Sequence, residues 1–409
     1  MWRTENTTPE ARFVPLPFRR AQACPFDPAS EITRRRAEEP VSRFQLPNGD
    51  SAWLVTRHAD VRGVLSDPRF SNALAPGTLL RPPNPDRPVE EPPMPLGMFI
   101  GMDPPEHTRL RRIVTGEFTV KRMNRLRPRI EQIVSQHLDA MELAGRPVDL
   151  VQDFAMPIPS LVMCELLGVP YGDRADFQRR SRAAVDMAVD PEQGLVMFLE
   201  MQEYMASLVA GQRADAGDDL LGMLVREHGD ELSDAELVGI GNMLLTAGHE
   251  TTANMLAIGV LLLLRHPRQA AVIRDTPEVV DQAVEEMLRY LSIVPSGLVR
   301  TATEEVPVGG TLIEAGDYVL VSLPAANRDG TRYPDADQFD ITHNADQHVA
   351  FGHGIHHCIG APLARMELRT AFPALLRRFP TLRLAVPFDC VRFRPSGSVH
   401  SVEALPVTW

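Results

Sequence analysis

The chain has 409 residues, and 42 Lys or Arg against 54 Asp or Glu give a formal net charge of −12. This balance argues against nucleic acid or an anionic membrane surface as a partner, because both attract clustered basic residues. The four cysteines lie far apart in sequence and form no disulfide framework, and no apolar run opens the chain. We therefore expect a reduced, cytoplasmic protein with no membrane anchor.

Two β-hairpins are predicted. Residues 41–46 and 52–56 flank an Asn-Gly pair, the strongest two-residue hairpin signal. Residues 306–308 and 318–322 flank a Gly-rich segment and are expected to pair in a similar way.

Residues 76–95 hold eight prolines and few periodic cues, which predicts a long surface loop. Such loops in compact enzymes are often binding loops or lids. A floppy connector between domains is the alternative interpretation.

Most of the remaining chain has apolar residues at the three-to-four spacing of amphipathic helices. The segments with this pattern are 106–118, 128–144, 192–213, 278–291 and 362–379. The sequence thus predicts a mainly α fold with small β-sheets (α+β) in one domain.

The longest predicted helix begins after Ser233, which forms a capping box with Glu236, and ends at Arg265 before His-Pro. It is apolar nearly all round, so we expect it to be buried. A membrane span is the competing interpretation, and the polar residues at its centre argue against it.

That polar break contains Ala247, Gly248, Glu250 and Thr251. Small residues allow a close approach to the helix backbone, and a mid-helix Thr can bond the carbonyl one turn back and open the helix locally. A helix–helix contact with one satisfied polar pair explains the break equally well.

A glycine-rich loop surrounds Cys358, and a predicted helix follows it. The positive end of that helix favours a thiolate, which is a strong ligand for haem iron. A zinc site built from neighbouring histidines is an alternative, although their spacing fits no common pattern. A nucleophilic cysteine with a histidine base is another.

Three motifs in one order resemble a known family. FGHGIHHCIG at 351–360 closely matches the haem-binding loop of the cytochrome P450 superfamily, AGHETT at 247–252 matches its oxygen-activation motif, and Glu286 and Arg289 match its Glu-x-x-Arg signature. The overall sequence is similar to those of the soluble bacterial class of this family, of the actinomycete CYP105-like type. The resemblance implies the cytochrome P450 fold, with haem between the long central helix and the Cys loop. It implies an N-terminal arm over 1–22 and a single catalytic domain over 23–409.

The resemblance implies roles for individual residues around haem b (iron protoporphyrin IX). Cys358 is the expected axial metal ligand, and the absence of Cys-x-x-Cys-His implies that the haem is not covalently attached. Four donors are expected to face the haem propionates: His107, Arg111, Arg300 and His356. Further cofactor contacts are expected from Ala247, Gly248, Phe351, Gly352 and Gly360, with Gly354 also allowing a close approach.

Glu250 and Thr251 are the expected catalytic pair, which delivers protons during O2 activation, while Ala247 and Gly248 leave space for dioxygen. Glu286 and Arg289 are expected to form a buried structural ion pair, with Glu285 as a competing partner. Gln338 stands where relatives usually carry an Arg, which leaves the third member of that network open.

An apolar, medium-to-large organic substrate is expected, because few charges lie in the segments that would form its walls. The predicted substrate contacts are Met94, Leu96, Leu244, Leu245, Val294, Gly297, Leu298 and Val399.

The predicted reaction is insertion of one oxygen atom, with electrons from NAD(P)H through a reductase and an acidic ferredoxin. Arg109, Arg112 and Arg365 are candidate ferredoxin contacts, and solvated surface charge explains them equally well. The alternative functions are a haem-thiolate peroxygenase or oxidative-coupling enzyme and, more remotely, a non-catalytic metal-binding protein.

Overall fold

The computed structural model describes residue 20 and residues 24–46, 48–74, 94–174, 176–177, 191–295, 297–394 and 399–409. Its α-helices are α1 (Ser30–Glu38), α2 (His58–Ser66), α3 (Glu106–Thr115), α4 (Val120–Ala144), α5 (Pro157–Leu167), α7 (Pro191–Ala214), α8 (Leu220–His228), α9 (Asp234–Arg265), α10 (Pro267–Asp275), α11 (Val280–Leu291), α12 (Leu323–Asn327) and α13 (Ala361–Arg378). The predicted mainly α architecture is confirmed.

The strands form three small sheets. They are β1 (Val41–Gln45), β2 (Ser51–Val55), β3 (Phe70–Ser71), β4 (Val148–Asp149), β5 (Leu298–Ala302), β6 (Val306–Val308), β7 (Thr311–Ile313), β8 (Tyr318–Val321), β9 (Arg383–Leu384) and β10 (Pro406–Thr408). The five-stranded sheet has the order β1-β2-β8-β5-β3, in which β2 and β8 are parallel and the other pairs antiparallel. The smaller sheets are β4-β10-β9 and β6-β7.

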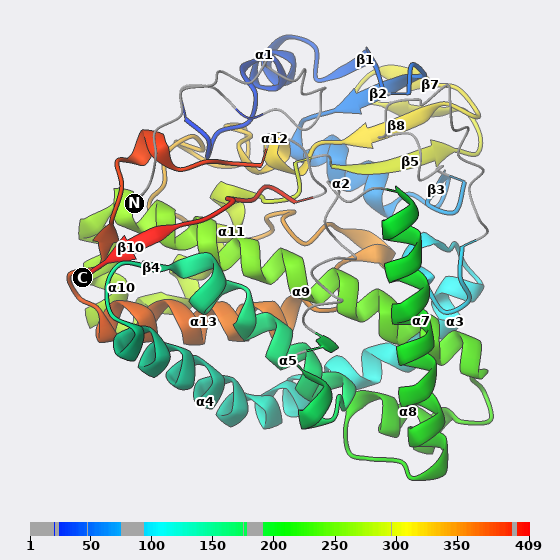
Figure 1. Cartoon of the computed structure of the whole chain (residues 1–409). Helices are drawn as coiled ribbons and strands as arrows, with labels where there is room; N and C mark the ends of the chain where they lie inside the picture. The colour runs from blue at the N-terminus through cyan, green and yellow to red at the C-terminus, as the bar shows by residue number, and fades with distance from the viewer. Residues whose placement is uncertain are drawn as a thin grey trace.

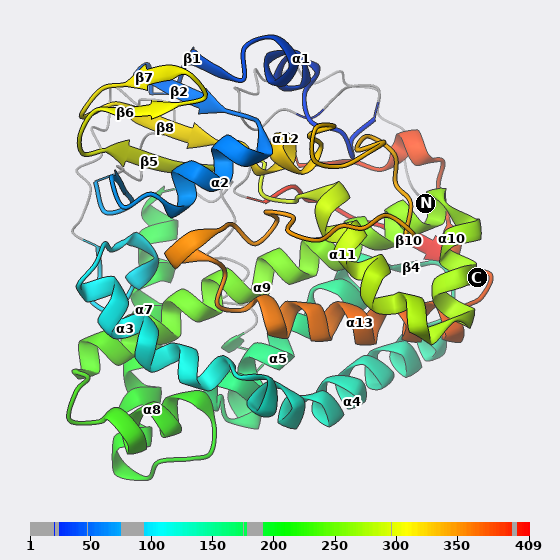
Figure 2. The ribbon, with the colours of Figure 1, turned by 180° about the vertical axis from the view of Figure 1, so that it is seen from behind.

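The five-stranded sheet lies apart from most of the helices. Figures 1 and 2 show this sheet at the top, beside α1, α2 and α12, with α9 running through the helical half above α13 and α4. α9 packs against α5, α7 and α13. Long apolar side chains along it, such as Leu256, Ile258 and Leu261, are fully buried. α9 is therefore the central helix of the core.

The long helix has the predicted bounds and cap. The Ser233 side chain accepts from the Glu236 backbone N–H, and the Glu236 side chain accepts from the Ser233 backbone N–H. Among the described helices, α9 is the one long and apolar enough to cross a membrane, and 72% of its most apolar window is buried in the fold. Such burial is typical of a core helix in a globular protein.

The first predicted hairpin is confirmed, since β1 pairs with β2 from Val41–Val55 to Gln45–Ser51. The second is wrong in its pairing. β6 turns back at Gly309 and Gly310, both at positive φ, and pairs with β7. β8 is thereby free to enter the five-stranded sheet between β2 and β5. The two-residue turn at Gly309 and Gly310 closes a hairpin between strands that are adjacent in sequence. β6 therefore pairs with β7 rather than with the more distant β8.

The predicted helices are present, with one substantial error in bounds. α4 begins at Val120 rather than residue 128, because the Thr119 side chain caps it by accepting from Arg122 N–H. Pro128 lies inside this helix, where it costs one backbone hydrogen bond. The predicted loop at 76–95 lies outside the described residues apart from Met94 and Pro95.

Candidate active site

The Cys358 loop is held by its own backbone. Cys358 N–H donates to Phe351 O at 2.9 Å, His357 N–H donates to Gly354 O at 3.0 Å, and α13 begins three residues after the cysteine. Gly352 and Gly354 have φ of 71° and 73°, the left-handed region that favours glycine. In Figures 1 and 2 the orange segment that leads into α13 lies next to α9.

The glycines of this loop serve different neighbours. A Cβ on Gly360 would lie 3.9 Å from Cys358 Sγ, so Gly360 borders the sulfur. A Cβ on Gly354 would instead collide with the backbone oxygen of Leu65 in α2. The missing side chain of Gly354 therefore allows the loop to pack against α2, a contact that the sequence does not predict.

Two opposing effects act on the Cys358 sulfur. Its side chain is accessible to solvent by surface area, yet protein surrounds it closely enough for desolvation to raise the pKa of its thiol. Hydrogen bonds from the backbone N–H groups of Gly360 and Ala361, with the charges of Arg111 and Arg365, oppose this rise in pKa. The start of α13 thus favours the thiolate, as predicted, and burial opposes it.

The four predicted propionate donors come together from three segments. α3 supplies His107 and Arg111, β5 supplies Arg300, and the Cys loop supplies His356. The rings of His107 and His356 have centroids 4.1 Å apart. Arg111 donates to the backbone oxygen of His357, and Arg300 donates to Asn72 Oδ1 at 2.6 Å.

Burial and mutual repulsion perturb these groups. Desolvation lowers the pKa of Arg300 to about 10. Desolvation, aided by the charges of His107 and Arg300, lowers the pKa of His356 to about 3. The pKa values of His107 and Arg111 are also lowered, chiefly by burial. Each of these shifts disfavours positive charge on the group, and an anion placed among the four side chains would oppose the shifts.

This cluster fits the two carboxylates of a haem. Within the described part of the chain, both ring nitrogens of the buried His107 lack a hydrogen-bond partner. Neither Arg111 nor Arg300 forms an ion pair with a carboxylate in those residues. Asp103, whose charge acts on the pKa of Arg300, already accepts from the Ser71 hydroxyl and from Asn72 N–H. Buried donors without acceptors are costly, and two propionates would supply the acceptors.

The middle of α9 presents an accessible face. Thr246 and Ala247 are exposed, and Glu250 and Thr251 are half-buried, whereas Leu244, Leu245 and Thr252 on either side are buried. The Thr251 hydroxyl donates to Ala247 O at 2.7 Å, the back-bond that the sequence predicts. The helix stays α-helical through this point, so the predicted local opening is not seen.

Gly248 also lies against α5. A Cβ on Gly248 would lie 2.7 Å from Met163 Sδ of α5. The space beside Gly248 is filled by this side chain, so the glycine serves the packing of α5 against α9.

The predicted substrate residues do not share one environment. Met94 and Leu96 are 51% and 60% exposed, and Val294 and Leu298 are half-buried. Leu244, Leu245 and Val399 are buried, and so is Gly297, whose φ of 66° is a backbone requirement. The accessible part of α9 begins at Thr246, which the sequence motifs do not single out. Helical phase would have found it, since Thr246 lies one turn before Glu250.

Glu286 and Arg289 form the predicted buried ion pair. Arg289 Nε and Nη2 donate to the two Glu286 oxygens at 2.7 and 2.8 Å, and both side chains are 0% exposed. Arg289 also donates to the backbone oxygens of Asn327, Ala336 and Gln338.

A nearby histidine, rather than Gln338, supplies the third side chain of the Glu286–Arg289 network. His343 Nδ1 lies 3.1 Å from Glu286 Oε1, which also accepts from Asp340 N–H, so His343 is the third side chain of the network. Arg328, which is nearby in sequence, instead contacts Asp27 and Asp337.

Glu285 has different partners from those expected. It binds Arg365 at 2.7 Å through both oxygens, Arg369 at 3.2 Å and His348 at 3.1 Å. Arg365 stacks over the Phe351 ring at 4.6 Å. Arg365 therefore braces the Cys loop, and Arg109 is likewise paired with Glu236. Of the three candidate ferredoxin contacts, these two are engaged within the protein.

The alternatives for the Cys loop lack support. Among the described residues, no three His, Cys, Asp or Glu side chains are grouped to hold a metal ion, which removes the basis for a zinc site. The groups that act most on the pKa of Cys358 are backbone N–H groups and arginines rather than a histidine base.

Comparisons with known proteins cover the whole chain. The sequence model of the family described as Cytochrome P450 matches residues 178–385. Cytochrome P450-SU2 of Streptomyces griseolus is 45% identical over 100% of both chains. Cytochrome P450 monooxygenase PikC of Streptomyces venezuelae is 44% identical over 94% of this chain and 91% of its own. The crystal structure of CYP105P1 in complex with filipin I superposes with a TM-score of 0.89 at 40% identity, covering 95% of this chain and 98% of that one. The chain therefore belongs to the cytochrome P450 family and is a haem-dependent monooxygenase related to the actinomycete CYP105-type enzymes.

Proposed function

We propose that this monooxygenase inserts one oxygen atom from O2 into a C–H or C=C bond of an apolar, medium-to-large organic substrate, in secondary-metabolite tailoring or xenobiotic oxidation. The observation that carries the proposal is the accessible face of α9, where Thr246 and Ala247 adjoin the half-buried pair Glu250 and Thr251. An acid and an alcohol in this position suit proton transfer beside a bound substrate.

Haem b, when bound, supplies an iron whose thiolate ligand donates electron density that favours O–O cleavage. Cys358 would be that ligand, with the N–H groups of Gly360 and Ala361 directed at the sulfur. His107, Arg111, Arg300 and His356 would hold the propionates. Phe351, clamped by Arg365, would limit the access of water to the sulfur side.

Thr251 and Glu250 would transfer protons at the site. The back-bond to Ala247 orients the Thr251 hydroxyl, so its oxygen remains able to accept a second hydrogen bond. Glu250, one residue before it on the same accessible face, would relay protons to Thr251 through water.

The proposed substrate class rests on accessible apolar side chains and on the similarity of the chain to the relatives named above. Met94, Leu96 and Ile100 are each more than half exposed.

Electrons would come from NAD(P)H through a ferredoxin reductase and an acidic ferredoxin. The protein would act in the cytoplasm, with a single catalytic domain over 23–409. Arg112 is the predicted contact that is exposed and has no ion pair in the described residues.

The test has two parts. The purified, reduced protein should give a strongly red-shifted carbon monoxide adduct, and Cys358→Ser should abolish it. Survival of that adduct in Cys358→Ser would refute the ligand assignment. Turnover of a substrate found by Soret-shift screening should require O2, NAD(P)H and the ferredoxin system, whereas equal turnover with hydrogen peroxide alone would favour a peroxygenase.

A further inference from the structure

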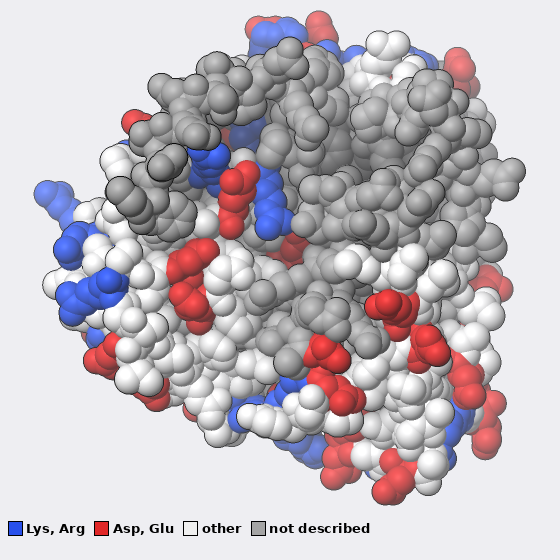
Figure 3. Space-filling view, viewed as in Figure 1, with Lys and Arg blue, Asp and Glu red and all other residues white. Residues whose placement is uncertain are grey.

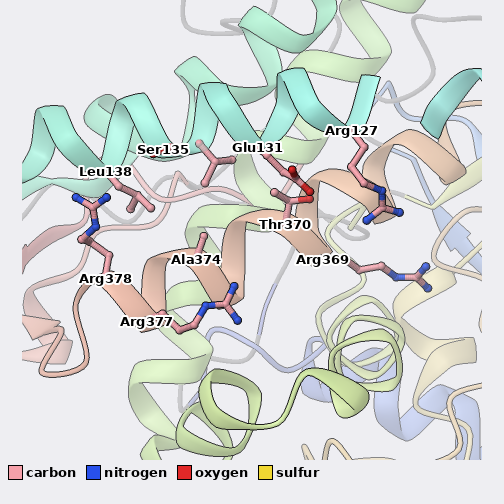
Figure 4. Close-up of a pocket in the computed structure, with 10 residues that line it drawn as sticks. Arg127, Glu131, Ser135, Leu138, Arg369, Thr370, Ala374, Arg377 and Arg378 are labelled. Atoms are coloured by element: carbon pink, nitrogen blue, oxygen red, sulfur yellow. The ribbon is translucent and has the colours of Figure 1, made fainter. Parts of the chain in front are cut away.

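A polar groove lies between α4 and α13, separate from the residues of the candidate active site. Its volume is about 570 Å³, within the range of small-molecule sites. Figure 4 shows α4 contributing Arg127, Glu131 and Ser135 from one face, and α13 contributing Thr370, Ala374 and several arginines. The small side chain of Ala374 keeps the groove open between the two helices.

The charge in the groove is unbalanced. Four arginines line it against one acid, Glu131. Arg378 is neutralised by Asp139 at 2.7 Å and Glu142 at 2.8 Å, and Arg369 by Asp281 at 3.1 Å and Glu285 at 3.2 Å. Arg127 and Arg377 have no ion pair or hydrogen bond in the part of the chain that the structure describes. Two free guanidinium groups therefore face one groove from opposite helices.

This concentration contrasts with the rest of the protein. The chain has a net charge of −12, and Figure 3 shows acidic side chains gathered over the part of the visible face where α7 and α8 lie. A membrane or a nucleic acid would meet net repulsion. A small anion that enters the groove would meet planar forks that bind phosphate through paired hydrogen bonds.

The groove is linked to the Cys358 loop by consecutive contacts. Arg369 shares Glu285 with Arg365, and Arg365 stacks on Phe351 at 4.6 Å. Phe351 O in turn accepts from Cys358 N–H. An anion that draws Arg369 into the groove would weaken its bond to Glu285 and so change the position of Arg365 over Phe351.

We propose that the groove between α4 and α13 binds a small molecule carrying a diphosphate, and that binding is transmitted through Arg369, Glu285 and Arg365 to the Cys358 loop. Arg127 and Arg377 would clamp the two phosphates from opposite helices. The diphosphate could belong to a nucleotide or to free pyrophosphate, which share this chemistry.

The experiment is calorimetric titration of the holoenzyme with inorganic pyrophosphate and, separately, with ADP at constant ionic strength. We expect saturable 1:1 binding of pyrophosphate that weakens by about tenfold or more in the double variant Arg127→Gln/Arg377→Gln. Arg383→Gln, which removes an exposed arginine outside the groove, should bind as the wild type does. Tighter binding of ADP would indicate a nucleotide, and equal or weaker binding would indicate the free anion.

The link to the loop has its own measurement. Pyrophosphate should shift the ferric Soret band with the same midpoint as the heat, and Arg369→Lys should bind pyrophosphate but lose this shift, because lysine lacks the fork that reaches Glu285. If pyrophosphate bound to the wild type with measurable heat but without a shift of the Soret band, the proposed link to the Cys358 loop would be wrong.

Absence of saturable heat, or equal binding by the double variant, would overturn the site. If the double variant instead weakens binding of an acidic ferredoxin while pyrophosphate gives no heat, the groove is a protein contact and the proposal is wrong. The heat is measured without substrate turnover, so its failure is distinguishable from failure of the proposed function.

Discussion

The Thr251 hydroxyl donates to the carbonyl oxygen of Ala247 at 2.7 Å, one turn back along a helix that is otherwise buried on both sides of this point. The bond fixes the hydroxyl on the accessible face of α9, next to Glu250. It also ties the alcohol to Ala247, which is exposed on that face.

We expect Thr251→Ala to lower product formed per NAD(P)H, because oxygen would be reduced without productive proton delivery. The rate of product formation should fall by about 10²-fold, the lower range for loss of a proton-transfer group. Product and hydrogen peroxide are measured together. Thr251→Ser keeps the hydroxyl and should retain most of the coupling, and unchanged coupling in Thr251→Ala would remove the proposed role.

If Arg300 holds a haem propionate as proposed, Arg300→Gln should weaken retention of haem, because a buried charged donor would be lost. One such bond contributes about 1.5–3 kcal/mol, which predicts haem release about 10- to 100-fold faster. Transfer of haem to excess apomyoglobin measures the rate. Arg57→Gln, at an exposed position, serves as the control, and equal release rates for both variants would refute the assignment of Arg300.

Glu286→Gln should lower the free energy of unfolding by about 3–5 kcal/mol, because Arg289 would remain charged and buried without its partner. Urea unfolding followed by far-ultraviolet circular dichroism tests this. Glu305→Gln, on the surface, should change stability by less than about 0.5 kcal/mol. If Glu286→Gln were as stable as the wild type, the prediction would be wrong. His343 and the three carbonyl partners of Arg289 would then be sufficient to stabilise the network without the carboxylate charge.

Glu285 should contribute stability that depends on pH. Burial raises its pKa, but hydrogen bonds from His348 and Arg365 prevail and lower it to about 2. Because the folded pKa is depressed, the contribution is complete above the unfolded value of about 4.5 and is lost as pH falls toward 2. Relative to Glu285→Gln, the wild type should be about 3 kcal/mol more stable at pH 6, and the gap should narrow below pH 4.5. A gap that stays constant between pH 6 and pH 3 would contradict this account.

Gly354→Ala should destabilise the protein more than Gly310→Ala. Both glycines have positive φ, so each substitution costs about 1–2 kcal/mol in backbone conformation. A Cβ on Gly310 meets nothing within 4 Å, whereas one on Gly354 collides with the Leu65 backbone, adding about 1–3 kcal/mol. Equal melting temperatures for the two variants would show that the loop shifts freely.

Local patterns in the sequence were sufficient for several features. The capping box at Ser233 and the apolar run after it predicted α9, because capping and periodicity act within a few residues. The Asn-Gly turn predicted the β1-β2 hairpin for the same reason. The back-bond of Thr251 followed from its place within a helix. The ordered motifs around Cys358 predicted the family, which the comparisons confirm.

Other features were decided only by the tertiary structure, since they depend on which distant segments meet. Local turn chemistry pairs β6 with β7, but only the assembled sheet places β8 between β2 and β5. Gly248 and Gly354 look alike in sequence, yet their roles come from Met163 and Leu65, contributed by other helices. Glu285 and Glu286 are adjacent, and helix rotation directs one to Arg365 and the other to Arg289. A sequence records which groups are present, whereas burial and three-dimensional packing determine which of them become partners.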